Sequence, residues 1–168
     1  MDSETRNLID FAQLLADAGR EICLEAMAGE RVVTFKPDTS MVTETDLAIE
    51  SRLREMIEKE FPGHGIFGEE FGNRDTDASH VWVLDPIDGT TAFIAGIPVY
   101  GTLIGLARGG RPYIGVIDHP ASNDRWIGVS GEMATMNGSP VRTRRRATLE
   151  RAFMTCSNPD FFDPGEFE

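Results

Sequence analysis

The stretch Trp82–Thr91 reads W-V-L-D-P-I-D-G-T-T, and the predicted elements on either side of it are best understood as its support. The apolar run Val81–Leu84, which leads into the first half of this stretch, predicts a short buried strand. We expect this strand to end at Asp85, because Pro86 has no N–H group to donate to a neighbouring strand. The stretch therefore delivers a carboxylate to the end of a strand.

The second half of the stretch predicts a turn into a short helix. Gly89 has no side chain to hinder a tight backbone. Thr90 and Thr91 are good N-cap residues for a helix over residues 92–94. The strand end and the helix start should then lie close together in space.

Two carboxylates, those of Asp85 and Asp88, would repel each other at this strand end unless cations lie between them. Hard divalent cations such as Mg2+ prefer oxygen ligands and keep several waters that a substrate can replace. The N–H groups of Gly89, Thr90 and Thr91 can bind an anionic oxygen at the start of the helix. Together these features predict a phosphate site. An Asx-type turn with two solvated aspartates is the alternative, and a second acidic string upstream makes it less favoured.

The string Asp85–Thr90 resembles the signature of the inositol monophosphatase superfamily, the Mg2+-dependent, lithium-sensitive phosphomonoesterases. Three upstream pieces fit in order, namely Lys36, the V-T-E-T-D string at Val42–Asp46 and the G-E-E string at Gly68–Glu70. The downstream segment Ala92–Leu106 is similar to the histidinol-phosphate phosphatase branch more than to the inositol branch. The resemblance spans nearly the whole chain.

The resemblance implies a set of Mg2+ ligands. They are the carboxylates of Glu69, Asp85 and Asp88 and the backbone carbonyl of Ile87, with Asp85 bridging two cations. Two cations about 3.5–4 Å apart would hold the attacking and leaving oxygens of an in-line displacement. For Glu69, an exposed surface position is the alternative.

The resemblance also implies catalytic and phosphate-binding residues. Thr90 and Asp46 would orient the attacking water, and with Glu69 they form the expected catalytic set. Thr90 could also cap the helix that follows it. The expected phosphate-binding residues are Asp88, Gly89, Thr90 and Thr91.

Two more residues are possible members of the site. Glu70 could hold a third, looser metal or help to place the water, and a solvated carboxylate is the alternative. Lys36 corresponds to a lysine that the family places near the metals, and a solvated lysine in a turn is the alternative.

Hydrophobic periodicity predicts two helices and a series of short strands. We expect one helix over residues 5–27 and a second from Thr43 or Thr45 to residue 60. The second helix has an apolar face and a polar face that includes Glu50, Arg54 and Glu58. Beyond the central strand, strands are expected over residues 32–35, 41–42, 66–68, 101–107, 112–117, 126–130, 133–136 and 152–156, with turns at 36–40 and 137–140, a surface loop at 72–79 and a helix opening near 158–160.

Two helices followed by a run of hairpins indicate an α+β fold, with two long helices on a mostly antiparallel sheet. The resemblance implies that this is the N-terminal part of a layered αβαβα sandwich of the inositol monophosphatase type. Residues 1–168 would form its metal-binding part, and no string like the W-D-x-A-A-G motif of the family's second half occurs in the chain. We therefore expect the C-terminal α/β part to be absent from this chain.

Composition and charge exclude some classes of function. The 168 residues carry a formal net charge of -12, which disfavours binding to nucleic acid. No apolar run approaches the roughly 18 residues needed to cross a membrane, and the first residues do not resemble a secretory signal, so we expect a cytoplasmic protein. Cys23 and Cys156 are expected as buried thiols and not as a disulfide.

The residues and the resemblance together predict a Mg2+-dependent phosphomonoesterase that acts on a small phosphorylated substrate. The expected reaction is hydrolysis of L-histidinol phosphate in histidine biosynthesis, and relatives imply a homodimer. One alternative is inositol-1-phosphate, or another small phosphate ester, as the substrate. Another is a metal-binding fragment without activity, and we expect this chain alone to be inactive or nearly so.

Overall fold

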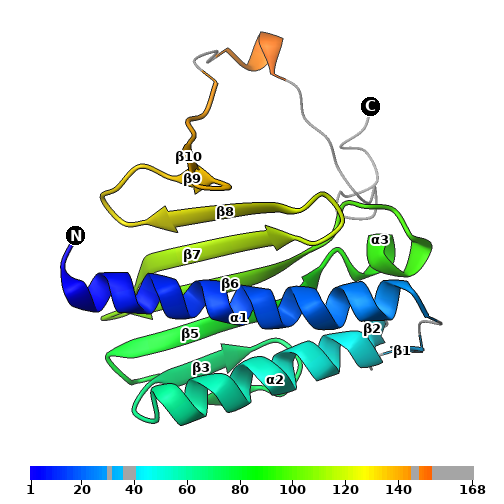
Figure 1. Ribbon diagram of the computed structural model, residues 1–168, viewed down its shortest axis with the longest axis horizontal. Coiled ribbons are helices and arrows are strands. Elements are labelled where there is room, and N and C mark those ends of the chain that lie inside the picture. Colours follow the sequence, from blue (N-terminus) through cyan, green and yellow to red (C-terminus); the bar gives the residue numbers. More distant parts are fainter. Residues whose placement is uncertain (30–31, 36–40, 145–147, 153–168) are drawn as a thin grey trace.

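Two long helices lie on one face of an extended sheet in the computed structural model, which describes residues 1–29, 32–35, 41–144 and 148–152 (Figure 1). The expected turn at 36–40, including Lys36, the helix near 158–160 and Cys156 lie outside these residues, as does most of the strand expected over 152–156. The elements in chain order are α1 (Ser3–Met27), β1 (Val33–Phe35), β2 (Met41–Thr43), α2 (Glu44–Glu60), β3 (Gly65–Gly68), β4 (Asn73–Arg74), β5 (His80–Asp88), α3 (Thr90–Ala95), β6 (Gly101–Arg108), β7 (Arg111–His119), β8 (Asp124–Val129), β9 (Thr135–Met136), β10 (Ser139–Pro140) and the 3-10 turn η1 (Leu149–Arg151).

Both long helices begin at a side-chain cap. The carboxylate of Asp2 accepts a hydrogen bond from the Thr5 N–H at 2.7 Å and starts α1. Thr43 and Asp46 form a capping box that starts α2, so the predicted start at Thr43 or Thr45 is confirmed. The apolar residues Leu8, Phe11 and Leu15 of α1 are buried, and Cys23 is a buried thiol on this helix, as expected.

Within the described residues, the main sheet has eight strands in the order β10-β9-β8-β7-β6-β5-β3-β4, and β1 and β2 form a separate two-stranded ribbon. Every pair is antiparallel except β3 with β5, which run parallel with Gly68 opposite Leu84. The prediction of two helices on a mostly antiparallel sheet is therefore confirmed. The helices bury the face of the sheet that carries Trp82, Ile104 and Val116.

The opposite face of the sheet carries exposed apolar side chains near its centre. Phe67, Val83 and Ile117 point away from the helices, and their side chains are 50%, 42% and 43% exposed. Alternating side chains on a strand point to opposite faces, so these residues are neighbours of the buried core positions and not part of the core. The described residues supply one helix layer and one sheet layer, with an apolar face left open to a further layer.

Several predicted boundaries were wrong. β5 does not end at Asp85, because Asp85 pairs with Leu103 and Asp88 pairs with Gly101. Pro86 and Ile87 of β5 thus lie opposite the single residue Thr102 of β6, which defines a β-bulge. The strand tolerates Pro86 because the bulge removes the need for a ladder hydrogen bond there.

Short strands also appear where loops were expected. The expected surface loop at 72–79 contains β4, which pairs with β3 through Arg74 and Ile66. The expected turn at 137–140 is shorter, since Asn137 and Gly138 take positive φ angles of 48° and 78° and β10 follows at once. Two-residue strands of this kind carry too little periodicity to be recognised in sequence.

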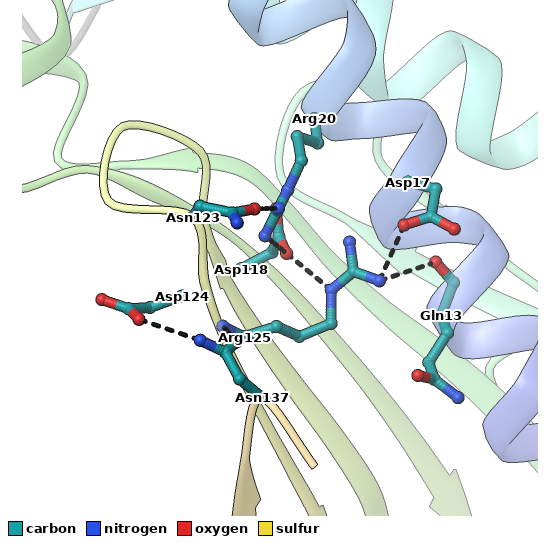
Figure 2. A network of polar contacts seen from close by, with 8 residues as sticks. All are labelled: Gln13, Asp17, Arg20, Asp118, Asn123, Asp124, Arg125 and Asn137. Carbon is teal, nitrogen blue, oxygen red and sulfur yellow. Dashed lines mark hydrogen bonds and ion pairs between the residues drawn. The ribbon is translucent and has the colours of Figure 1, made fainter.

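A polar network joins the middle of α1 to β7 and β8 (Figure 2). Asp118 is fully buried, and its carboxylate accepts hydrogen bonds from Arg20 at 2.6 and 2.9 Å and from Arg125 at 2.6 Å. Arg125 also pairs with Asp17 at 2.7 Å, and Arg20 donates to Asn123. The hydrogen bonds that Arg20 donates to Asp118, together with the negative charge of Asp118, raise the pKa of Arg20 and so favour the charged pair.

Replacement of Asp118 by Asn should destabilise the fold by about 3 kcal/mol, because it leaves two arginines at the helix–sheet junction without their shared buried carboxylate. Chemical denaturation of the chain measures this loss. The matched control is Asp17→Asn, which removes a carboxylate that is 62% exposed and should cost less than about 1 kcal/mol. Equal effects of the two substitutions would contradict this account of the network.

His64 closes an aromatic cluster at the other end of the helix layer. The Trp82 indole N–H donates to His64 Nδ1 at 3.1 Å, and the His64 ring stacks on Phe61 and on His80. Burial lowers the pKa of His64, the nearby His80 lowers it further, and Glu4 opposes the change. Neutral His64 can accept the indole hydrogen bond, whereas the protonated ring has no acceptor left.

Since the folded pKa of His64 lies below its unfolded value of about 6.5, its contribution to stability is present above that pH and is lost as the pH falls through the folded pKa. We expect the free energy of unfolding of the chain to drop below about pH 6.5, and the drop to be smaller in His64→Gln. Urea denaturation over a pH series measures both. The control His119→Gln keeps His64 and should keep the drop, and an unchanged pH profile in His64→Gln would rule the assignment out.

Candidate active site

The parallel pairing of β3 with β5 brings two acidic segments to one edge of the sheet. Gly68 ends β3 opposite Leu84, so Glu69 comes next to Asp85. The Glu69 N–H donates to the Leu84 carbonyl at 3.2 Å, which continues the strand pairing by one residue. Glu69 and Asp85, which are 16 positions apart in the sequence, are thereby placed side by side.

The pKa of Asp85 is raised by burial and by this arrangement of acids. Burial of its carboxyl group, with the negative charges of Glu69, Asp88 and Asp46 and a hydrogen bond shared with Glu69, raises its pKa to about 7. Its Oδ1 atom is buried and has no hydrogen-bond partner among the residues that the structure describes. A buried oxygen without a partner costs free energy, which a cation at this position would relieve.

Asp46 reaches the site from the first turn of α2. Its Oδ2 accepts hydrogen bonds from the Thr43 N–H at 2.8 Å and the Thr43 hydroxyl at 2.5 Å. Its Oδ1 lies 3.5 Å from the Thr90 hydroxyl, which also donates to the Ile87 carbonyl at 3.0 Å. Burial raises the pKa of Asp46, with Glu69 adding to the effect. The structure therefore brings Asp46, Thr90 and the Ile87 carbonyl together.

The start of α3 differs from the prediction. Neither Thr90 nor Thr91 is the N-cap, because Gly89 takes that position with φ 83° and no side-chain cap bond is made. Glycine suits this left-handed backbone, and Val99 O would lie 3.0 Å from a Cβ added there. The helix has six residues, so its dipole is small and any anion would rely on direct N–H donation in its first turn.

Glu69 and Glu70 sit differently on the segment that follows β3. Glu69 is exposed, and Glu70 is partly buried. The N–H of Glu70 donates to the carboxylate of Glu50 at 2.7 Å. Glu50, which the sequence places on the polar face of the second helix, has a fully buried side chain. Its i,i+4 spacing from Arg54 was the sequence signal for a buried ion pair.

Thr102 is a second residue that sequence reasoning missed. It is fully buried on β6 opposite the bulge, and its hydroxyl donates to the Pro86 carbonyl at 2.8 Å. The bulge frees that carbonyl from the ladder, and the Thr102 side chain satisfies it. The spacing of Asp85 and Asp88 depends on this bulge.

The chemistry of the donor set fits a hard divalent cation. It offers carboxylates and a backbone carbonyl, a buried Asp85 oxygen without a partner among the described residues, and neighbouring acids that raise the pKa of Asp85. Within the described ranges, however, no three Asp, Glu, His or Cys side chains stand close enough to form a ready-made metal cluster. A bound cation would have to draw these side chains closer together.

No helix in the part of the chain that the structure describes has the length and apolar character to cross a membrane.

The sequence of residues 4–160 matches the model of the inositol monophosphatase family. The chain is similar to a histidinol-phosphatase from Mycobacterium tuberculosis, with 41% identity over 77% of this chain and 50% of that protein. It is also similar to the bifunctional phosphatase IMPL2, chloroplastic, from Arabidopsis thaliana, with 39% identity over 96% of this chain and 47% of that protein.

The fold is similar to a solved inositol monophosphatase from Zymomonas mobilis, with a TM-score of 0.74 and 39% identity over 87% of this chain and 56% of that chain. The chain spans about half the length of these relatives. A family match over nearly all of the chain and a shared fold lead to one conclusion. The chain belongs to the inositol monophosphatase family.

Proposed function

We propose that this chain carries the metal-binding part of a Mg2+-dependent phosphomonoesterase, and that its substrate is L-histidinol phosphate in histidine biosynthesis. The observation that supports it most is the half-buried Asp85 carboxylate, held beside Glu69 where the parallel pairing of β3 with β5 ends, with a buried Oδ1 atom that has no partner among the described residues. The family match gives this cluster its chemical context.

Glu69, Asp85 and Asp88 would hold Mg2+ with the Ile87 carbonyl, which keeps a lone pair after accepting from Thr90. Bound there, Mg2+ would supply Lewis-acid stabilisation of the charge on the phosphoryl oxygens. Phosphate monoesters hydrolyse very slowly without a catalyst, so charge stabilisation and positioning are the main demands on the site. Glu70 and Lys36 stay possible further members of the site.

Thr90 and Asp46 would orient the attacking water. The Thr90 hydroxyl donates to the Ile87 carbonyl and lies 3.5 Å from Asp46 Oδ1, so a water that donates to the Thr90 oxygen would lie between the capping box of α2 and the start of α3. The buried Asp46 carboxylate is held in place because the Thr43 N–H and hydroxyl both donate to its Oδ2 atom. Its Oδ1 atom is then a fixed acceptor for the water. The phosphate would contact Asp88 and the N–H groups of Gly89, Thr90 and Thr91.

The choice of substrate rests on similarity and on charge. The relative from M. tuberculosis is named a histidinol-phosphatase, whereas the Z. mobilis structure is named an inositol monophosphatase, so inositol-1-phosphate is the second candidate. Histidinol phosphate carries an ammonium group and inositol phosphate carries none. A chain with a net charge of -12 favours the substrate with the positive group.

The whole enzyme is proposed to include a C-terminal α/β part in addition to residues 1–168, and to be a homodimer in the cytoplasm. The open apolar face of the sheet at Phe67, Val83 and Ile117 supports the additional part, because such a surface is stabilised when another layer covers it.

The full-length enzyme should release phosphate from histidinol phosphate when Mg2+ is present, and faster than from inositol-1-phosphate. Asp85→Asn should reduce turnover by at least about 100-fold, because it removes a charged oxygen ligand. Colorimetric phosphate assays measure both. The control is Asp75→Asn, at an exposed aspartate that should leave turnover within about twofold. Phosphate release that does not depend on Mg2+, or that survives in Asp85→Asn, would end the proposal.

The 168-residue chain alone should show almost no turnover, since the proposed second half would complete the site. It should also bind a hydrophobic dye such as ANS more strongly than the full-length enzyme, through the open sheet face. Turnover of any phosphate ester by the chain alone at an ordinary enzyme rate would show that the second half is not required.

A further inference from the structure

Glu50 is a fully buried carboxylate that the proposed chemistry does not use. It lies one turn after Asp46 on α2 and points toward the segment that follows β3. Its Oε2 accepts the Glu70 N–H at 2.7 Å, and its Oε1 accepts the Phe71 N–H at 3.2 Å. Both donors belong to the backbone directly after Glu69.

Glu69 is therefore held from both sides. Its own N–H is bound to the Leu84 carbonyl of β5, and the next two N–H groups are bound to Glu50. The close approach of Glu50 also explains Gly68, because a Cβ at that position would overlap the Glu50 carboxylate. The backbone path through residues 68–71 is set by one side chain of α2.

Arg54 completes the arrangement. Its Nε donates to Glu50 Oε1 at 2.8 Å, and it also donates to the Gly72 carbonyl. Glu50 and Arg54 thus bind the backbone of residues 70–72 through both donors and acceptors. A buried ion pair adds little net stability compared with apolar residues, so its benefit here is a defined position for the segment that it holds.

The same face of α2 serves both halves of the site. Asp46 faces Thr90, and Glu50, four residues later, faces the segment with Glu69. Residues at i and i+4 lie above one another on a helix. One rigid helix therefore sets the distance between the signature and the acidic segment.

We infer that Glu50 is a positioning residue for Glu69, and that its loss would weaken Mg2+ binding without removing a ligand. The inference rests on the proposed function, since it takes Glu69 as a ligand of the metal. Residues that hold metal ligands in place commonly contribute 10- to 100-fold to metal affinity, and an effect of about 10-fold or more is expected for Glu50→Gln.

Two measurements on the chain test this. Amide exchange followed by NMR should show protection of the Glu70 and Phe71 N–H groups falling by about 10-fold in Glu50→Gln, because Gln cannot accept all three of the donors that Glu50 serves. Titration calorimetry with Mg2+ should show the weaker affinity. The control Glu55→Gln changes an exposed glutamate on the same helix and should leave both values unaltered.

If Glu50→Gln does not fold, the double variant Glu50→Gln/Arg54→Gln removes both charges and should fold with the same two losses. Glu50-dependent Mg2+ binding in a protein that hydrolyses no phosphate ester would support the positioning role and reject the proposed function. A full-length enzyme that is active, with Mg2+ affinity unchanged by Glu50→Gln, would reject the positioning role and keep the function. A chain that binds no Mg2+ would reject both.

Discussion

The parallel pairing of β3 with β5 is the contact on which the candidate site depends. Every other strand pair in the sheet is antiparallel, and an antiparallel arrangement here would send the segment after β3 to the opposite edge. Because parallel strands end at the same edge, Glu69 comes to lie beside Asp85. The result is a group of acids that repel one another, and Asp85 responds with a pKa of about 7. The fold holds these charges together at a cost in stability, which is typical of sites built for a ligand.

Polar contacts away from the acids keep this arrangement in place. Thr102 satisfies the Pro86 carbonyl that the bulge in β5 leaves out of the ladder. The Thr43–Asp46 capping box sets the start of α2, and Glu50 binds the backbone next to Glu69. At the far side of the helix layer, Asp118 ties α1 to β7 and β8 through two arginines. Buried polar groups of this kind define positions more than they add stability, since their desolvation offsets most of the gain.

Much of the site could be predicted because its signals are local. The D-P-I-D-G-T string, the G-E-E string and the Thr43 cap are each readable within a few residues, and their order along the chain is specific to the family. The burial and the hydrogen-bond partners of Glu50 and Thr102 could not be predicted in the same way. Each meets its partner 16 to 21 residues away in the sequence, so whether a polar side chain is solvated or buried depends on how α2 and β6 pack. The end of β5 was misjudged for a related reason, since a bulge is a property of two paired strands and not of one.

The amino-acid sequence by itself determined the two helices and most of the strands, and it predicted which of their groups would bind a cation and a phosphate. Those features follow from residue chemistry and from hydrophobic periodicity, both of which are local. Only the tertiary structure decided that Glu69 lies beside Asp85, that Thr90 faces Asp46, and that Glu50 is buried behind the acidic segment. These are relations between segments distant in the chain, and the free energy that selects them comes from packing the helices on the sheet.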